Sequence, residues 1–154
     1  MTTLLADPTL PGLIRKLANQ NCRALGTLGE QLTFRILEKR YHVSNTHPKE
    51  RRGDLRVVTD DGLILRVEVK TARQSTDGKW RFTLYKAGHT DHRDSDVIIA
   101  LCVLPAGYVV PFVIPTTAVA QQRALVISSN PQTYAGKFAR FRQHIRTINL
   151  EMKS

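Results

Sequence analysis

The sequence predicts an α/β domain in which helices flank a mixed, mostly antiparallel central β-sheet. Apolar residues recur at helical spacing near the N-terminus, and they alternate or run together in short β-branched segments farther along the chain. The dipeptide Asp61-Gly62 lies between two such segments and favours a β-hairpin. The chain has 154 residues, of which 42% are hydrophobic, so we expect one globular domain spanning 1–154.

The elements are expected in the order of two helices, five or six strands and a final helix. The helices cover 9–21 and 25–40, and the second ends at basic residues, which a helix C-terminus favours. The final helix begins near Asn130, a good cap, with Pro131 in its first turn. Its apolar stripe has spacings typical of a helix and consists of Tyr134, Phe138, Phe141, Ile145 and Ile148. The expected strands are 54–58, 63–72, 80–85, 96–104, 108–114 and 124–129.

The charge balance predicts a polyanionic partner. Lysine and arginine number 23 against 13 acidic residues, and the formal net charge is +10. Nucleic acid is the commonest partner of such a chain, and a membrane surface is the main competitor.

One segment, 97–122, contains no charged residue and is long enough to cross a bilayer. Pro105, Gly107 and Pro111 interrupt it, however, and would break a helix. The β-branched runs on either side of the turn instead indicate a buried hairpin. We therefore expect no contact with a membrane.

The two cysteines, Cys22 and Cys102, are far apart in the sequence and lie among apolar or helix-forming residues. They indicate buried, reduced thiols rather than a disulfide framework. The N-terminus shows neither the basic nor the long apolar region of a signal peptide. A cytoplasmic protein, of prokaryotic or phage type, is expected.

The predicted hairpin carries the residues of greatest chemical interest. Side chains two positions apart share a face of a strand, so Glu68 and Lys70 lie together. Taken alone, this pair is more typical of a solvated sheet face. Asp54 opens the other strand of the hairpin, and two carboxylates with one ammonium suit Mg²⁺ and a phosphate substrate.

A third acid, Glu30, lies on the predicted helix 25–40. Phe34 at i+4 and Leu37 at i+7 place it in a partly apolar sector of that helix. A surface helix acid is the common explanation of such a residue. A partly buried acid needs a partner, however, and a metal or Lys70 would serve.

These residues resemble the motifs of the PD-(D/E)XK nuclease superfamily, which has the restriction-endonuclease-like fold. "GTLGE" ends at Glu30, "GD" is Gly53 and Asp54, and "EVK" runs from Glu68 to Lys70, in the order that the superfamily uses. The pattern looks particularly like Holliday junction resolvases and the homing endonucleases of group I introns. One departure is Gly53, where the superfamily motif has proline.

The resemblance covers most of 25–142 and implies a Mg²⁺-dependent DNA endonuclease, with Mn²⁺ as a substitute. It implies that Asp54 and Glu68 are metal ligands, that Lys70 is the catalytic lysine and that Glu30 is an accessory ligand. Cutting two strands with one centre per chain suggests a homodimer or homotetramer. The alternatives are a restriction-type enzyme and a catalytically silent DNA-binding module, and the sequence leaves junction and duplex substrates open.

Basic residues near this centre and on the predicted final helix are candidate DNA contacts. For both groups a solvated charged surface is the competing interpretation. The candidates are Lys49, Arg51, Arg52, Arg56, Arg73, Lys137, Arg140 and Arg142. The segment 89–96 contains histidines and aspartates, but it lacks a second ligand cluster and is a weak zinc candidate.

Overall fold

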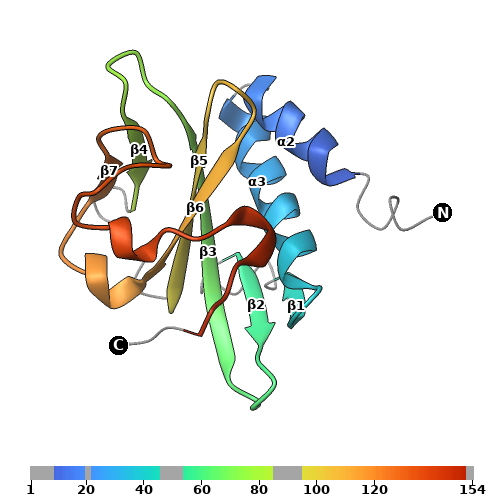
Figure 1. Ribbon diagram of the computed structural model, residues 1–154. Coiled ribbons are helices and arrows are strands. Elements are labelled where there is room, and N and C mark those ends of the chain that lie inside the picture. The colour runs from blue at the N-terminus through green and yellow to red at the C-terminus, as the bar shows by residue number, and fades with distance from the viewer. Residues whose placement is uncertain (1–8, 20–21, 46–53, 85–94, 152–154) are drawn as a thin grey trace.

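The computed structural model describes residues 9–19, 22–45, 54–84 and 95–151, and their elements form three layers (Figure 1). A five-stranded sheet lies between two α-helices on one side and a two-stranded sheet on the other. The helices are α2 (Thr9–Asn19) and α3 (Cys22–Leu37). The strands are β1 (His42–Asn45), β2 (Leu55–Val58), β3 (Ile64–Arg73), β4 (Trp80–Thr83), β5 (Val97–Val103), β6 (Val109–Pro115) and β7 (Ala124–Ile127).

The five-stranded sheet has the order β1-β2-β3-β5-β6. Only β3 and β5 pair in parallel within it, and the other neighbours are antiparallel. The carboxylate of Asp96 accepts a hydrogen bond from the backbone N–H of Arg66 at 2.8 Å, which anchors the start of the parallel pair. The predicted mixed, mostly antiparallel sheet flanked by helices is therefore confirmed.

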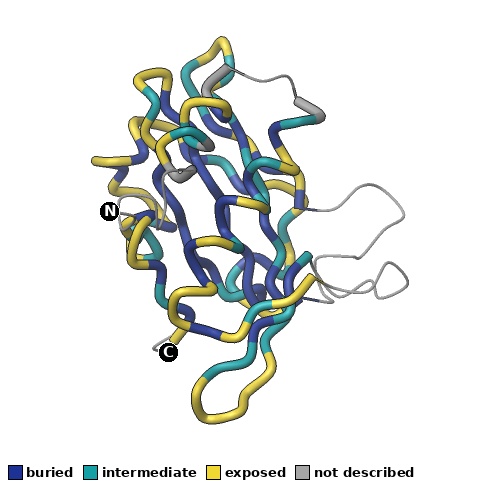
Figure 2. Tube along the Cα trace, turned by 90° about the vertical axis from the view of Figure 1, so that its right-hand side faces the viewer, coloured by how far each residue is buried: buried dark blue, intermediate teal, exposed yellow. Residues whose placement is uncertain are grey.

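Strand alternation divides the core into two parts. Val67 and Val69 of β3 face the helices, whereas Ala72 faces β4 and β7. Every residue of β5 is buried, because this strand is covered on both faces (Figure 2). Trp80 packs in the second part of the core, where its indole N–H donates to the Val103 carbonyl at 3.0 Å.

The predicted buried hairpin is confirmed in β5 and β6, which pair antiparallel along their whole length. Gly107 has φ +91° in the connecting turn, a backbone conformation that glycine adopts without strain. Cys102 is fully buried and free, as expected. No helix in the described ranges is long and apolar enough to cross a membrane.

The final helix predicted from residue 130 is wrong. Two short 3-10 helices, η3 (Ala139–Phe141) and η4 (Ile145–Thr147), occur in a segment that is otherwise extended or turned. Figure 1 shows this segment crossing in front of β6, from the β4–β7 side to the helix side. Tyr134 and Phe138 accordingly pack in one part of the core, and Ile145 and Ile148 in the other.

The physical reason is that a helix has only one face toward its support, whereas this apolar stripe has two supports. An α-helix would keep all five apolar side chains on one side. The extended segment instead wraps the β6 edge, where Arg142 forms a β-bridge with Phe112.

Smaller differences from the expected elements concern their bounds and two short elements that the sequence does not predict. The sequence does not predict β1, a short strand with only one partly buried apolar residue packed on the core, Val43. The helix α3 ends at Leu37 rather than at residue 40, and a turn follows in which the Arg40 N–H donates to the Leu37 carbonyl at 3.0 Å, the i→i−3 bond of a tightened last turn. A 3-10 helix, η2 (Thr116–Val119), follows β6.

Candidate active site

Asp54 directly precedes β2, at the end of its pairing with β3. Its backbone N–H donates to the Val67 carbonyl at 2.8 Å, and its carboxylate accepts from the Val69 N–H, also at 2.8 Å. The register pairs β2 with β3 only up to Leu55 and Val67, and beyond it the Asp54 carboxylate satisfies the Val69 N–H. This hydrogen bond anchors the Asp54 side chain on β3.

Glu30 reaches Asp54 from the helix layer, and Gly29 permits the approach. A Cβ atom at position 29 would collide with the side chain of Thr71 in β3, so only glycine lets α3 lie this close to the strand. The carboxyl groups of Glu30 and Asp54 share a hydrogen bond. Glu30 is half-buried, as its helical sector predicts.

Glu68 and Lys70 share the other face of β3, as the strand alternation predicts. The Lys70 ammonium lies 3.6 Å from a Glu68 carboxylate oxygen, with 30% of the lysine side chain and 14% of the glutamate side chain exposed. The positive charge of Lys70 also acts on Asp54. Lys70 is therefore electrostatically coupled to acids of both hairpin strands.

The three acids do not form one cluster. Glu30 approaches from the helix side of the sheet, whereas Glu68 projects from the face that β4 and β7 cover farther along. In the part of the chain that the structure describes, no three acidic, histidine or cysteine side chains are grouped to hold a metal ion. The structure brings together Glu30 with Asp54 and Glu68 with Lys70, as two linked pairs.

The acid pair has shifted proton affinities. Burial is the main cause that raises the pKa of Glu30 from 4.5 to about 7, and the negative charge of Asp54 adds to it. Burial also raises the pKa of Asp54, against the lowering effects of the Val69 N–H and the Lys70 charge. Both carboxyl groups of the pair therefore hold a proton more readily than free carboxylates do.

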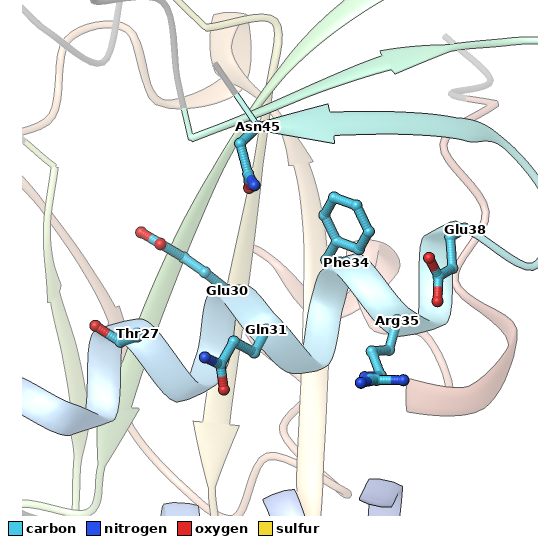
Figure 3. Close-up of a pocket in the computed structure, with 7 residues that line it drawn as sticks. All are labelled: Thr27, Glu30, Gln31, Phe34, Arg35, Glu38 and Asn45. Atoms are coloured by element: carbon cyan, nitrogen blue, oxygen red, sulfur yellow. The ribbon is translucent and has the colours of Figure 1, made fainter. Parts of the chain in front are cut away.

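A groove of about 700 Å³ runs along α3 from Thr27 past Glu30 to Glu38, and Asn45 at the end of β1 lies on its other side (Figure 3). Asn45 points from β1 toward Glu30 and Phe34. Gln31 and Arg35 also line the groove. Asn45 is not among the site residues predicted from the sequence, because it ends a strand, β1, that has only one apolar residue.

The predicted DNA-binding residues lie in different places. Arg56 pairs with Arg66 across β2 and β3 and shares the face of Glu68. Arg73 lies on the helix face, where its Nε–H donates to the Leu17 carbonyl at 3.0 Å. The others in the described ranges lie in the C-terminal segment that crosses β6 (Figure 1), and they are Lys137, Arg140 and Arg142. Lys49, Arg51 and Arg52 lie outside the described residues, as do residues 89–94 of the weak zinc candidate.

Comparison with solved structures finds a bacterial homing endonuclease, I-Ssp6803I. The two structures match with a TM-score of 0.60 over 79% of this chain and 86% of that chain, at 17% sequence identity. This chain shares the fold of that endonuclease. No family model matches the sequence, and no curated protein matches it significantly.

The five-stranded sheet and the two helices belong to a nuclease-like architecture. At this identity the likeness describes the fold alone. The chemical role of Glu30, Asp54, Glu68 and Lys70 must therefore be argued from their own geometry.

Proposed function

We propose that this protein is a metal-dependent endonuclease of the PD-(D/E)XK type that hydrolyses phosphodiester bonds in DNA. The observation that carries the proposal is the hydrogen-bonded pair of Glu30 and Asp54, with the charge of Lys70 beside it, on a nuclease-like fold. The net charge of +10 supports a polyanionic substrate. A homing-endonuclease-like or Holliday-junction-resolvase-like activity, in a homodimer or homotetramer, is the form of this proposal that the motifs favour.

The acid pair fits a hard divalent cation. Two partly buried carboxyl groups in contact must either share a proton or be neutralised by a positive charge. Mg²⁺ typically takes one or two protein carboxylates and completes its shell with water and phosphate oxygens. We propose that Asp54 of this pair is one ligand and that Glu30 is the accessory acid. Glu68 is the second proposed ligand, and because it lies with Lys70 rather than in the acid pair, it would have to reach the ion from the neighbouring strand β3. Mn²⁺ would substitute for Mg²⁺.

A bound Mg²⁺ would neutralise phosphate charge and make its water more acidic. The chain itself supplies three further functions. Lys70 offers an ammonium that can stabilise negative charge developing on the phosphate. Asp54 is fixed by the Val69 N–H, and Glu30, in contact with Asp54, would be the accessory acid.

The experiment that tests this function compares Asp54→Ala with Asp60→Ala. Supercoiled plasmid and a synthetic four-way junction are incubated with each protein, with Mg²⁺ or with chelator. Wild type and Asp60→Ala should cleave only with Mg²⁺, because Asp60 is an exposed residue of the β2–β3 turn. Asp54→Ala should cleave at least about a hundredfold more slowly, a loss typical of a removed charge-stabilising group.

The same experiment can reject the proposal. Equal cleavage by wild type and Asp54→Ala would remove Asp54 from the chemistry. Tight DNA binding without cleavage of either substrate by wild type would identify a silent binding module. Preference for the junction over the plasmid would favour resolvase-like activity.

A further inference from the structure

A second groove, of about 680 Å³, lies at the opposite edge of the sheet from β1. Three segments enclose it: the start of α2, the turn between β5 and β6, and the C-terminal segment that crosses the β6 edge. Figure 1 shows these three segments on the same side of the molecule. The candidate active site, at β2 and β3, is separated from it by β5 and β6.

The groove has a cationic rim and an apolar floor. Arg15, Arg142, His144 and Arg146 line it, and none of the described residues that line it is acidic. The floor includes Ile14, Val109 and Ile145. Phosphates can bind to such a rim while flat, weakly polar groups contact the floor.

Two of the rim side chains are held in place by the protein. The Arg142 guanidinium donates to the Tyr134 carbonyl at 2.6 Å and lies 6.0 Å from the centre of the Phe112 ring. The His144 Nδ1 accepts from the Arg146 N–H at 3.2 Å, so its Nε2 carries the proton of the neutral ring. A held donor loses less conformational entropy when it binds a phosphate.

Tyr108 provides an aromatic surface at the same groove. It is 61% exposed, and it is one of three large hydrophobic residues that are exposed in the described part of the chain. The turn that presents it is closed by a hydrogen bond from the Gly107 N–H to the Leu104 carbonyl at 2.9 Å. An exposed aromatic ring beside arginines is the arrangement that proteins use to bind unpaired bases.

We propose that this groove binds single-stranded nucleic acid, with phosphates on Arg15, Arg142 and Arg146 and a base stacked on Tyr108. A duplex would offer phosphates but no free base to the tyrosine. The groove would therefore hold an unpaired strand while a different part of the substrate lies at Asp54. This binding requires no catalysis and is independent of the proposed metal.

The test measures fluorescence anisotropy of a labelled oligothymidylate in the presence of chelator, with full-length variants. Tyr108→Ala should weaken binding about tenfold, and Tyr108→Phe should retain it, because stacking needs the ring and not the hydroxyl. Arg146→Ala should reduce the log-log slope of affinity against salt by about 0.7, the value for one phosphate of a single strand. Arg123→Ala removes one exposed charge from outside the groove and should leave both quantities unchanged.

Three outcomes would overturn the proposal. One is unchanged oligothymidylate binding in both Tyr108→Ala and Arg146→Ala, with thermal unfolding showing that the variants are folded. A second is loss of binding in Asp54→Ala, which would place the strand at the candidate active site instead. A third is co-sedimentation with phosphatidylserine vesicles that both groove variants abolish while oligothymidylate binding persists, which would indicate a membrane surface. Failure of plasmid cleavage would leave this binding result intact and would count only against the proposed nuclease.

Discussion

At the scale of single residues, the contact between Glu30 and Asp54 is the feature most sensitive to conditions. The two carboxyl groups come from different layers of the fold and meet because Asp54 is anchored on the Val69 N–H. Their mutual repulsion is relieved by a proton at low pH. At high pH only a cation, either Lys70 or a bound metal, can relieve it.

The raised pKa of Glu30 predicts how stability depends on pH. Between pH 4.5 and about 7 the folded chain binds more protons at this residue than the unfolded chain, so the free energy of unfolding falls as pH rises through this window. Because Glu30 is only half-buried, solvent screening reduces the expected loss to about 1 kcal/mol. Glu30→Gln should lack this loss, as measured by urea unfolding with chelator at several pH values.

Magnesium provides the control for that measurement. At a pH above 7, added Mg²⁺ should raise the stability of wild type, because a ligand that binds only the folded state stabilises it. It should have a smaller effect on Asp54→Ala. Parallel pH profiles of wild type and Glu30→Gln would contradict the assignment of the shifted group.

At the scale of elements, the distance between α3 and β3 positions the acid pair. Thr71 is β-branched, has little rotamer freedom and lies against Gly29. No hydrogen-bond partner among the described residues contacts its buried hydroxyl, so its role is one of packing. A larger residue at position 29 would push the helix away and take Glu30 with it.

The two glycines of α3 allow a matched comparison. Gly29→Ala should destabilise the protein by about 1–3 kcal/mol through overpacking, whereas Gly26→Ala should stabilise it by up to about 1 kcal/mol through helix propensity. The reason is that a Cβ at position 26 meets no atom within 4 Å. Thermal and urea unfolding check both values. Equal effects of the two substitutions would mean that α3 does not need its close approach to β3.

At the scale of the whole molecule, the excess positive charge should govern the proposed association with DNA. Affinity for duplex DNA should fall steeply with salt, with a log-log slope of about −0.9 for each phosphate neutralised. An affinity that salt does not change would contradict DNA as the partner. Filter binding or anisotropy over a salt series makes the measurement.

The oligomeric state is a second property of the whole molecule. One candidate centre per chain and two strands to cut lead us to expect a homodimer or homotetramer. Light scattering coupled to size exclusion should give a mass that is a multiple of 17.4 kDa. A monomer that cuts both strands of a duplex would contradict the expectation.

Most strands, and the chemistry of one strand face, follow from local patterns in the sequence. Alternation is a local property, so the hairpin of β2 and β3, the buried pair β5 and β6, and the shared face of Glu68 and Lys70 could all be predicted. Motif order predicts the four residues proposed for catalysis, and the helical sector of Glu30 predicts its half-buried position.

Which side chains contact each other, and where the C-terminal segment runs, depends on tertiary packing. The apolar stripe that runs from Tyr134 to Ile148 has helical spacing, but an extended segment that packs on both sides of a sheet edge buries these side chains equally well. Likewise, only the folded structure brings the Asp54 carboxylate to the Val69 N–H and to Glu30. The spacing of apolar residues predicts that a side chain is buried, but it does not identify the residues that bury it, because they lie far away in the sequence.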